Sequence, residues 1–179
     1  MCGFTGYLSQ SSIDPSSHSE SIIKEMTRRL IHRGPDSEGF WRDCDAGIVM
    51  GFRRLAILDV SSNGNQPMIS HSGQYVLVFN GEIYNHLALR REISSIKPNY
   101  QWLSSSDTET LLSGFELWGI EKTIQKCTGM FGFSVWCNKN KVLTLGRDRL
   151  GEKPVYYGWQ GAPHEKIFLF GSELKSFHN

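Results

Sequence analysis

The sequence has little that would cross-link the chain, anchor it in a membrane or bind a polyanion. It contains four cysteines, at positions 2, 44, 127 and 137. They form no C-x-x-C pair and have no histidine at metal-ligand spacing, which argues against a disulfide framework and against a metal site. The longest apolar runs, such as residues 76–79, are far shorter than the ~20 residues that span a bilayer. The 19 Lys and Arg residues face 18 Asp and Glu residues, so no basic excess is present for nucleic acid.

The beginning of the chain does not resemble a targeting segment. Residues 1–10 lack both the basic n-region and the apolar h-region of a signal peptide. We therefore expect a cytoplasmic protein, in a compartment that keeps thiols reduced. In that setting Cys44, Cys127 and Cys137 are interpreted as small buried hydrophobic residues, whereas Cys2 is singled out by its position.

The distribution of apolar residues predicts one α+β domain over residues 1–179. No internal repeat, low-complexity tract or long linker divides the chain, and helices stand between groups of strands without a repeating βαβ rhythm. Strands are expected at 2–8, 48–50, 55–58, 75–79, 130–137, 142–146, 155–159 and 167–170, and helices at 19–33, at 85–96, from 106 onward and at 173–177. The Ser-Asp-Thr-Glu sequence at 106–109 matches a capping box, and Asn85 is expected to cap the preceding helix.

Cys2 could act as a nucleophile that carries its own base. Met1 precedes this small residue, so removal of the methionine would leave Cys2 with a free α-amino group. An α-amine has an ordinary pKa of about 7.7–8.0 and can take the thiol proton near neutral pH. The thiolate would then attack an amide or ester carbonyl and form a thioester.

Such an acyl transfer also needs hydrogen-bond donors for the developing oxyanion. Asn80 and Gly81, at the end of the apolar strand 75–79, could offer a side-chain amide and a backbone N–H in adjacent positions. The same pair is also a strong signal for a type I′ hairpin turn. The pattern alone leaves both interpretations open, although residues 82–86 look like the start of a helix.

Several ordered motifs resemble one known family along essentially the whole chain. Together they look like the class II glutamine amidotransferase domain of asparagine-synthetase-type enzymes, and the Arg-Gly-Pro-Asp segment at 33–36 points to the asparagine-synthetase branch. The motifs are MCG at 1–3, HRGPD at 32–36, RRLAILD at 53–59, NQPM at 65–68, FNGEIYN at 79–85, SD at 106–107, GMFGF at 129–133, RDRLGEKP at 147–154 and SELK at 172–175.

The resemblance implies a fold and a reaction. The fold is that of the N-terminal-nucleophile hydrolases, with two antiparallel sheets sandwiched between helical layers. The reaction is the hydrolysis of glutamine to glutamate and ammonia, without a cofactor or a metal in this domain. Cys2 would be the nucleophile with its own amine as base, and Asn80 and Gly81 would form the oxyanion hole.

The resemblance also assigns the groups that would bind glutamine. Arg54 would bind the α-carboxylate, because a guanidinium can pair with it in a bidentate manner, and Asp107 would bind the α-ammonium. Glu82 and the backbone around Leu55 and Ile57 would line the pocket. The alternatives are that Asp107 only favours a helix N-terminus and that Arg54 is one more surface charge.

Other motif residues are interpreted as scaffold. Arg33 and Asp36 are expected to form a buried ion pair that fixes the loop near Cys2. Arg147, Asp148 and the turn at 151–154 are expected to be structural or to face a partner domain. Three aromatic residues, Tyr156, Tyr157 and Trp159, are expected in the core or in an interface.

Members of the family usually continue into an ATP-using synthetase domain that receives the ammonia. The Ser-Gly-Gly-x-Asp-Ser loop of that domain does not occur here, so we expect an excised domain rather than a shortened gene product. ATP and magnesium would belong to the synthetase domain, in cis or in trans, and a homodimer is possible. The acceptor of the ammonia, aspartate, a sugar or another compound, is left open. The alternatives are an amidase of another specificity, or a silent regulatory or binding module if Met1 is retained.

Overall fold

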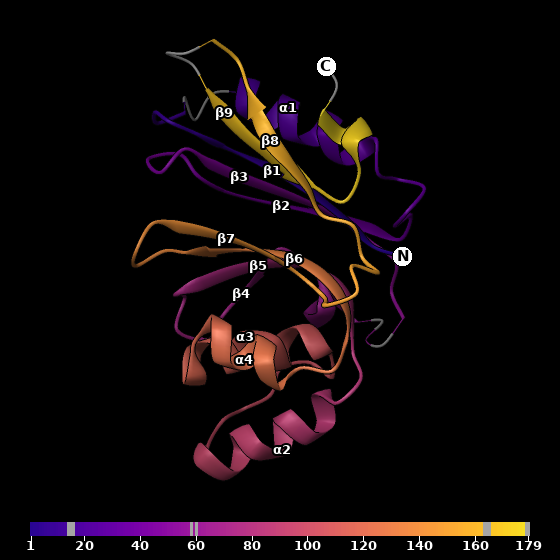
Figure 1. The fold of residues 1–179 in the computed structure, drawn as a ribbon, viewed down its shortest axis with the longest axis vertical. Helices are drawn as coiled ribbons and strands as arrows, with labels where there is room; N and C mark the ends of the chain where they lie inside the picture. The colour runs from indigo at the N-terminus through magenta and orange to yellow at the C-terminus, as the bar shows by residue number, and fades with distance from the viewer. Residues whose placement is uncertain (14–16, 58, 60, 163–165, 178–179) are drawn as a thin grey trace.

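Two antiparallel sheets form the centre of the molecule (Figure 1). The computed structural model describes residues 1–13, 17–57, 59, 61–162 and 166–177. The first sheet has the strand order β2-β3-β1-β9-β8 and the second has the order β4-β5-β6-β7. The strands of the first are β1 (Gly3–Ser9), β2 (Ser37–Asp43), β3 (Ile48–Arg54), β8 (Tyr156–Gln160) and β9 (Ile167–Gly171). Those of the second are β4 (Met68–Ile69), β5 (Tyr75–Ile83), β6 (Gly129–Cys137) and β7 (Val142–Arg147).

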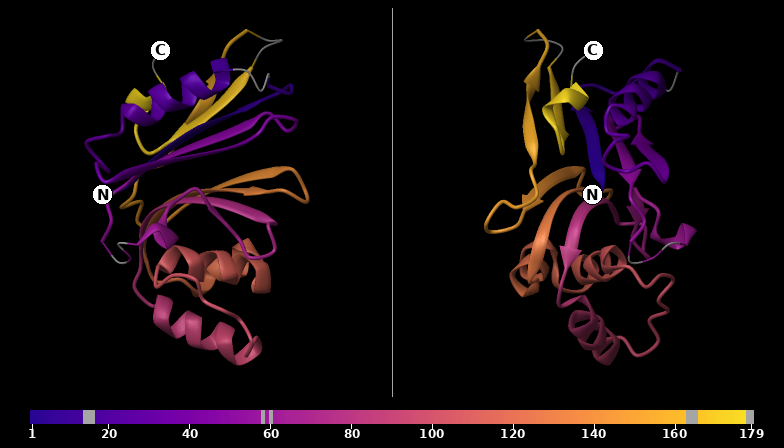
Figure 2. Two further views of the ribbon diagram at one scale, coloured as in Figure 1. Left: turned by 180° about the vertical axis from the view of Figure 1, so that it is seen from behind. Right: turned by 90° about the vertical axis from the view of Figure 1, so that its right-hand side faces the viewer.

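Helices cover the outer face of each sheet, so the layers run helix, sheet, sheet, helix (Figures 1 and 2). On the first sheet lie α1 (Ser17–Arg28) and the short 3-10 helix η2 (Leu174–Phe177). The second is covered by α3 (Asp107–Trp118) and α4 (Ile120–Lys126), and α2 (His86–Ile96) packs on α3; a 3-10 turn, η1 (Ser62–Gly64), precedes β4. The expected α+β fold with two sandwiched antiparallel sheets is confirmed. No helix in the described ranges is long and apolar enough to cross a membrane.

The alternation of side chains along the strands explains this layering. On β3, Met50 and Phe52 lie in the core between the sheets, whereas the intervening Gly51 faces α1. A Cβ at Gly51 would lie 2.1 Å from Thr27 Oγ1, so the glycine lets α1 approach the strand. On β5, Val76 and Val78 join the same core and alternate with residues that pack under α3. β3 and most of β5 are therefore buried on both faces.

The sheets differ in how far their strands are paired. β5 pairs with β6 along its whole length, from Tyr75↔Cys137 to Ile83↔Gly129. On its other edge β4 pairs only with positions 76 and 77. The second half of β5 therefore has one edge without a neighbouring strand, and this edge lies where β1 begins and β3 ends.

Most of the expected elements are present, with differences at several boundaries. Segment 55–57 follows β3 without strand structure, so the strand expected at 55–58 is wrong in the part that is described; residue 58 lies outside the described residues. The helix expected to reach residue 33 ends at Arg28 and continues as turns. The helix expected at 173–177 is the 3-10 helix η2. The sequence patterns did not indicate β2, β4 or α4.

The structure excludes one of two alternatives for the aromatic residues of β8 and for Asn80-Gly81, and it corrects the expected cap of α2. Tyr156, Tyr157 and Trp159 are 42%, 68% and 60% exposed on β8, which excludes a core position, and an interface position stays a prediction. Asn80-Gly81 is not a hairpin turn, because β5 continues through it to Ile83 and α2 begins only at His86. Asn85 precedes α2 but makes no side-chain cap there; its amide bonds to the backbone at residues 126 and 128.

Candidate active site

One pocket brings together all eight residues singled out from the sequence. It lies between the start of β1, the end of β3, the unpaired half of β5 and the N-terminus of α3. The eight are Cys2, Arg54, Leu55, Ile57, Asn80, Gly81, Glu82 and Asp107. The same pocket is also lined by Met1, Asp59, Gly64, Gln66, Phe79, Ser106, Thr108, Met130 and Lys153.

Contacts on both sides hold Cys2 in place. The Leu55 N–H donates a hydrogen bond to Cys2 Sγ at 3.3 Å, and the Arg33 Nε donates to the Cys2 carbonyl oxygen at 2.8 Å. Arg33 in turn pairs with the Glu173 carboxylate at 2.7 Å, and with His32 and Lys175 it holds the pKa of Glu173 at about 2. The thiol is thereby fixed at the wall of the pocket.

The expected ion pair between Arg33 and Asp36 is wrong. Arg33 reaches across to Glu173, whereas the Asp36 carboxylate accepts the Ala56 N–H at 2.8 Å. The Asp36 carboxylate is thus hydrogen-bonded by a backbone N–H of the loop that follows β3. The prediction rested on the closeness of Arg33 and Asp36 in sequence, which does not reveal a contact with that loop. Each residue still supports a segment that touches Cys2, because Ala56 directly follows Leu55.

The Cys2 thiol needs a local base to ionise. Burial raises its pKa, and the Leu55 N–H, the N-terminal amine, Arg54 and Arg33 oppose that rise only in part. While Met1 is attached, the nitrogen of Cys2 is an amide and cannot accept a proton. Met1 is 58% exposed at the mouth of the pocket, so it is accessible for removal.

Asn80 presents an unused hydrogen-bond donor to the pocket. Its side chain is only 2% exposed, yet its Nδ2 has no hydrogen-bond partner among the described residues. Buried polar groups are normally hydrogen-bonded, and leaving one unpaired costs about 1–3 kcal/mol. A buried donor that lines a pocket is therefore available to a ligand.

The backbone N–H of Gly81 is a second such donor. The Tyr84 N–H donates to the Thr128 carbonyl, which fixes the hydrogen-bonded pairs of the β5–β6 ladder at even positions of β5. Gly81 is opposite Phe131 in a non-hydrogen-bonded pair, so its N–H points away from β6. The Phe131 carbonyl is consistent with a non-hydrogen-bonded pair, because it points away from β5 and accepts the Asp148 N–H.

Side chains form hydrogen bonds with the neighbouring backbone groups on this unpaired edge of β5. The Gln66 amide accepts the Phe79 N–H at 2.6 Å and donates to the Phe79 carbonyl at 3.2 Å. Two residues beyond Gly81, the Ile83 N–H donates to Asp107 Oδ2 at 2.9 Å. Among the described residues no side chain does the same for Gly81, which leaves its N–H open between two satisfied neighbours.

Asp107 is placed by the start of α3. Ser106 Oγ accepts the Glu109 N–H at 3.3 Å, which confirms half of the expected capping box. The Glu109 carboxylate turns instead to the N–H groups of Leu103 and Ser104. Asp107 is 4% exposed, and burial raises its pKa, while the Ile83 N–H and His86 favour its charged form.

Arg54 is buried and holds the loop at Asp59 and residues 61–65, which borders the pocket. Its guanidinium donates to the Ser61 carbonyl and to Asn65 Oδ1, each at 2.7 Å, and also to the Asp59 carbonyl. Gly64 packs on it so closely that a Cβ there would lie 2.3 Å from Arg54 Nη2. The alternative that Arg54 is a surface charge is therefore wrong.

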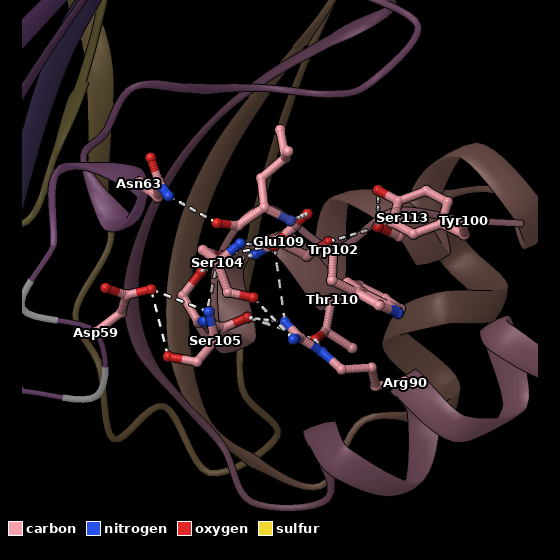
Figure 3. A network of polar contacts seen from close by, with 12 residues as sticks. Asp59, Asn63, Arg90, Tyr100, Trp102, Ser104, Ser105, Glu109, Thr110 and Ser113 are labelled. Atoms are coloured by element: carbon pink, nitrogen blue, oxygen red, sulfur yellow. Dashed lines mark hydrogen bonds and ion pairs between the residues drawn. The ribbon is translucent and has the colours of Figure 1, made fainter.

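A polar network fastens the same loop to the segment that precedes Asp107 (Figure 3). The Asp59 carboxylate accepts the Ser105 N–H at 2.9 Å, and Asn63 Nδ2 donates to the Leu103 carbonyl at 2.8 Å. Hydrogen bonds from Ser61 and Ser105 hold the pKa of Asp59 at about 2. The Arg90 guanidinium completes the network from α2 by donating to the Ser104 carbonyl.

Sequence reasoning missed two residues of the pocket as functional candidates, Gln66 and Lys153. Each lies in a motif of the resemblance, but its contacts are with distant parts of the chain. The turn at 151–154 is built on the Asp148 carboxylate, which accepts four backbone N–H groups, from Phe131, Leu150, Glu152 and Lys153. Asp148 therefore has a structural role, as expected from the sequence.

No group of three or more His, Cys, Asp or Glu side chains that could hold a metal ion occurs in the described part of the chain. The chemistry available in the pocket is that of a thiol, two open N–H donors, a buried arginine, a buried lysine and carboxylates. This set is suited to acyl transfer, with donors for an oxyanion close to a sulfur nucleophile.

Comparison with known proteins gives a consistent family and fold. The family model described as "Glutamine amidotransferase domain" matches residues 1–179. The glutamine-hydrolyzing asparagine synthetase 1 of Bacillus subtilis (strain 168) is 39% identical over 176 residues, which cover 98% of this chain and 26% of that protein. Asparagine synthetase 3 of Arabidopsis thaliana, also glutamine-hydrolyzing, is 37% identical over 98% of this chain and 28% of its own length.

A solved structure, the glutamine phosphoribosylpyrophosphate amidotransferase from B. subtilis complexed with ADP and GMP, has the same fold with a TM-score of 0.78. At 17% identity it covers 98% of this chain and 43% of that chain. This chain spans about a quarter of the length of the first-named synthetase.

Proposed function

This chain belongs to the family of glutamine amidotransferase domains, and from that premise we propose that it hydrolyses glutamine to glutamate and ammonia once Met1 is removed. The reaction passes through a thioester on Cys2. The observation that carries the proposal is the pair of open donors, Asn80 Nδ2 and the Gly81 N–H, in the same pocket as the Cys2 thiol.

The first half of the reaction forms the thioester. The free α-amine of Cys2 takes the thiol proton, and the thiolate attacks the carboxamide carbon of glutamine. The carbonyl oxygen becomes an oxyanion that accepts hydrogen bonds from Asn80 Nδ2 and the Gly81 N–H. When the C–N bond breaks, the ammonium returns its proton to the leaving nitrogen, and ammonia departs.

The second half regenerates the thiol. The amine, neutral again, removes a proton from a water molecule that attacks the thioester carbon. The same two donors receive the second oxyanion. The C–S bond breaks, the thiolate recovers its proton from the amine, and glutamate is released.

Selectivity for glutamine comes from the far end of the pocket. The substrate α-ammonium pairs with Asp107, whose burial strengthens the attraction, and Glu82 adds negative charge nearby. Arg54 attracts the α-carboxylate and also holds the Asp59–Asn65 loop in place. Leu55 and Ile57 line the same pocket.

The ammonia serves an amidation that this domain does not perform. The relatives are named glutamine-hydrolyzing asparagine synthetases and are about four times as long as this chain, so the domain supplies an ATP- and magnesium-using synthetase, in cis or in trans. Asparagine formation is the amidation that the relatives' names favour. Four free cysteines, one of them the nucleophile, fit a reducing compartment, and we assign the protein to the cytoplasm.

Intact mass spectrometry with a glutamine-analogue electrophile tests the function. We expect a mass without Met1, one adduct from 6-diazo-5-oxo-norleucine, and protection by glutamine but not by asparagine. Cys2→Ala should take no adduct, whereas Cys44→Ala, at a half-exposed free cysteine, should be labelled like the wild type. Protection by other amides would indicate an amidase of another specificity, and a retained Met1 without an adduct would indicate a silent module.

A further inference from the structure

Lys153 is a buried cation without an acidic partner. Its side chain lines the pocket and is only 7% exposed. Within the described residues it takes part in no salt bridge, and its Nζ has one contact, with Met1 Sδ at 3.2 Å. A thioether is a weak acceptor, and a buried ammonium is normally paired. No group among the described residues neutralises this charge.

The backbone holds Lys153 firmly at this place. Its N–H donates to Asp148 Oδ2 at 3.0 Å, and the same carboxylate fixes the backbone of Phe131 and Glu152. The lysine therefore projects from a braced turn on the second sheet toward the start of β1. The position of its backbone does not depend on the contact with Met1.

Removal of Met1 changes what this ammonium faces. The Met1 sulfur is joined to the nitrogen of Cys2 through at most about 6 Å of covalent chain. With the contact of 3.2 Å, the Cys2 nitrogen lies within about 9 Å of Lys153 Nζ. Once Met1 is gone, that nitrogen is an α-amine, and the space between the two groups is vacated.

We propose that Lys153 lowers the pKa of the Cys2 α-amine after Met1 is removed, and so keeps it in the neutral form that acts as base. This inference rests on the proposed glutaminase function and assigns Lys153 as a positioning residue of that site. Two cations near each other disfavour the protonated amine, and the effect is largest away from bulk water.

The other charges around the amine show why Lys153 is needed. Glu82, Asp107 and Asp59 line the pocket, and as carboxylates they favour the protonated amine. The cations Arg33 and Arg54 also lie near Cys2. Arg33 is neutralised by Glu173, and Arg54 is engaged by the loop carbonyls.

Arg54 and Lys153 therefore both counter the carboxylates, and Lys153 is the cation that contacts the residue whose removal creates the amine. Among the described residues that line the pocket, the thiol of Cys2 is the remaining titratable group.

A titration of the amine itself tests the inference. The chain has four cysteines, and after Met1 removal only Cys2 carries an α-amine, so protein labelled with [13C]cysteine reports its ionisation through the Cys2 Cα resonance. Lys153→Met should raise the pKa of the amine by about 0.5–1 unit, which lowers the neutral fraction at pH 7 by at most about three- to tenfold. Lys153→Arg keeps the charge and should restore most of the wild-type value.

The control is Lys139→Met, which also removes one positive charge. Lys139 is exposed in the turn beyond the far end of β6, about 20 Å from the pocket end of that strand by its length. In Lys139→Met the pKa of the Cys2 amine should equal the wild-type value. Intact mass confirms removal of Met1 in every variant, and Lys153→Gln replaces Lys153→Met if the latter does not fold.

The acid limb of the glutaminase pH profile gives the second measurement. It should move upward with the amine in Lys153→Met, with KM for glutamine nearly unchanged. An unchanged amine pKa in Lys153→Met, or in Lys153→Gln where that variant replaces it, overturns the inference while leaving the glutaminase function intact. If Lys153→Met raises the amine pKa but the wild-type chain neither reacts with the electrophile nor hydrolyses glutamine, the electrostatic role is supported and the function is refuted.

Discussion

Replacing Asn80 by alanine should separate activity from stability. The Nδ2 of this buried side chain has no partner among the described residues, so its burial already carries a desolvation penalty of about 1–3 kcal/mol. Asn80→Ala removes that penalty while it leaves a small cavity. The two effects oppose each other, and we expect the free energy of unfolding to change by less than about 1 kcal/mol.

The effect on turnover should be much larger. Loss of one oxyanion donor typically lowers kcat about 10²–10³-fold, equivalent to about 2.7–4 kcal/mol. KM should change little, because the donor matters most when charge develops on the oxygen. Steady-state glutaminase kinetics and urea unfolding on the same preparation measure both quantities.

Asn85 provides the matched control from the end of the same strand. Its amide donates to the Lys126 carbonyl and accepts the Thr128 N–H, each at 2.9 Å. Asn85→Ala should therefore lower the stability by about 1–2 kcal/mol, or Tm by about 2–8 °C, and leave kcat near the wild type. The reasoning is refuted if Asn80→Ala loses as much stability as Asn85→Ala while its kcat stays within tenfold of the wild type.

Three further outcomes are expected. Asp107→Asn keeps an acceptor for the Ile83 N–H but loses the charge, so KM for glutamine should rise about 10–100-fold at nearly constant stability; an unchanged KM removes Asp107 from the pocket. The pKa of Asp59 is held at about 2, below its ordinary value, so its stabilisation is complete above about pH 4 and is lost as pH falls toward 2. Urea unfolding should show a shallower acid loss for Asp59→Asn than for the wild type, and parallel curves would contradict this. Gly51→Ala places a Cβ 2.1 Å from Thr27 Oγ1 and should destabilise the fold by about 1–3 kcal/mol, whereas Gly158→Ala, with nothing within 4 Å, should not; equal melting temperatures for the two would refute the close packing of α1.

Local patterns predicted the elements that carry most of the pocket. The apolar run before Asn80 gave the strand, and the serine cap before Asp107 gave the helix start. Both signals depend on residues within a few positions of each other, which is the range over which periodicity and capping act. The turn interpretation of Asn80-Gly81 failed because strand pairing with β6 outweighed the local preference of the dipeptide.

The contacts that complete the site could not be read from such patterns. Arg33 and Glu173 are 140 positions apart, and Gln66 serves as a strand partner for Phe79 through its side chain. Lys153 belongs to a turn motif whose conformation is set by Asp148, while its ammonium lies in a pocket built from other segments. Only the tertiary fold brings these groups together.

The strand order of the first sheet has a consequence for how the protein is made. β1 lies in the middle of that sheet, between β3 and β9, and the Cys2 carbonyl is held through Arg33 by Glu173. Residues at the start of this domain therefore reach their final contacts only after residues 167–173 have been synthesised. A nascent chain short of residues 167–173 exposes its thiol on an unfinished sheet, without the ion pair that anchors it. The order of synthesis thus delays the fixing of Cys2 in the pocket until the rest of the domain has been synthesised.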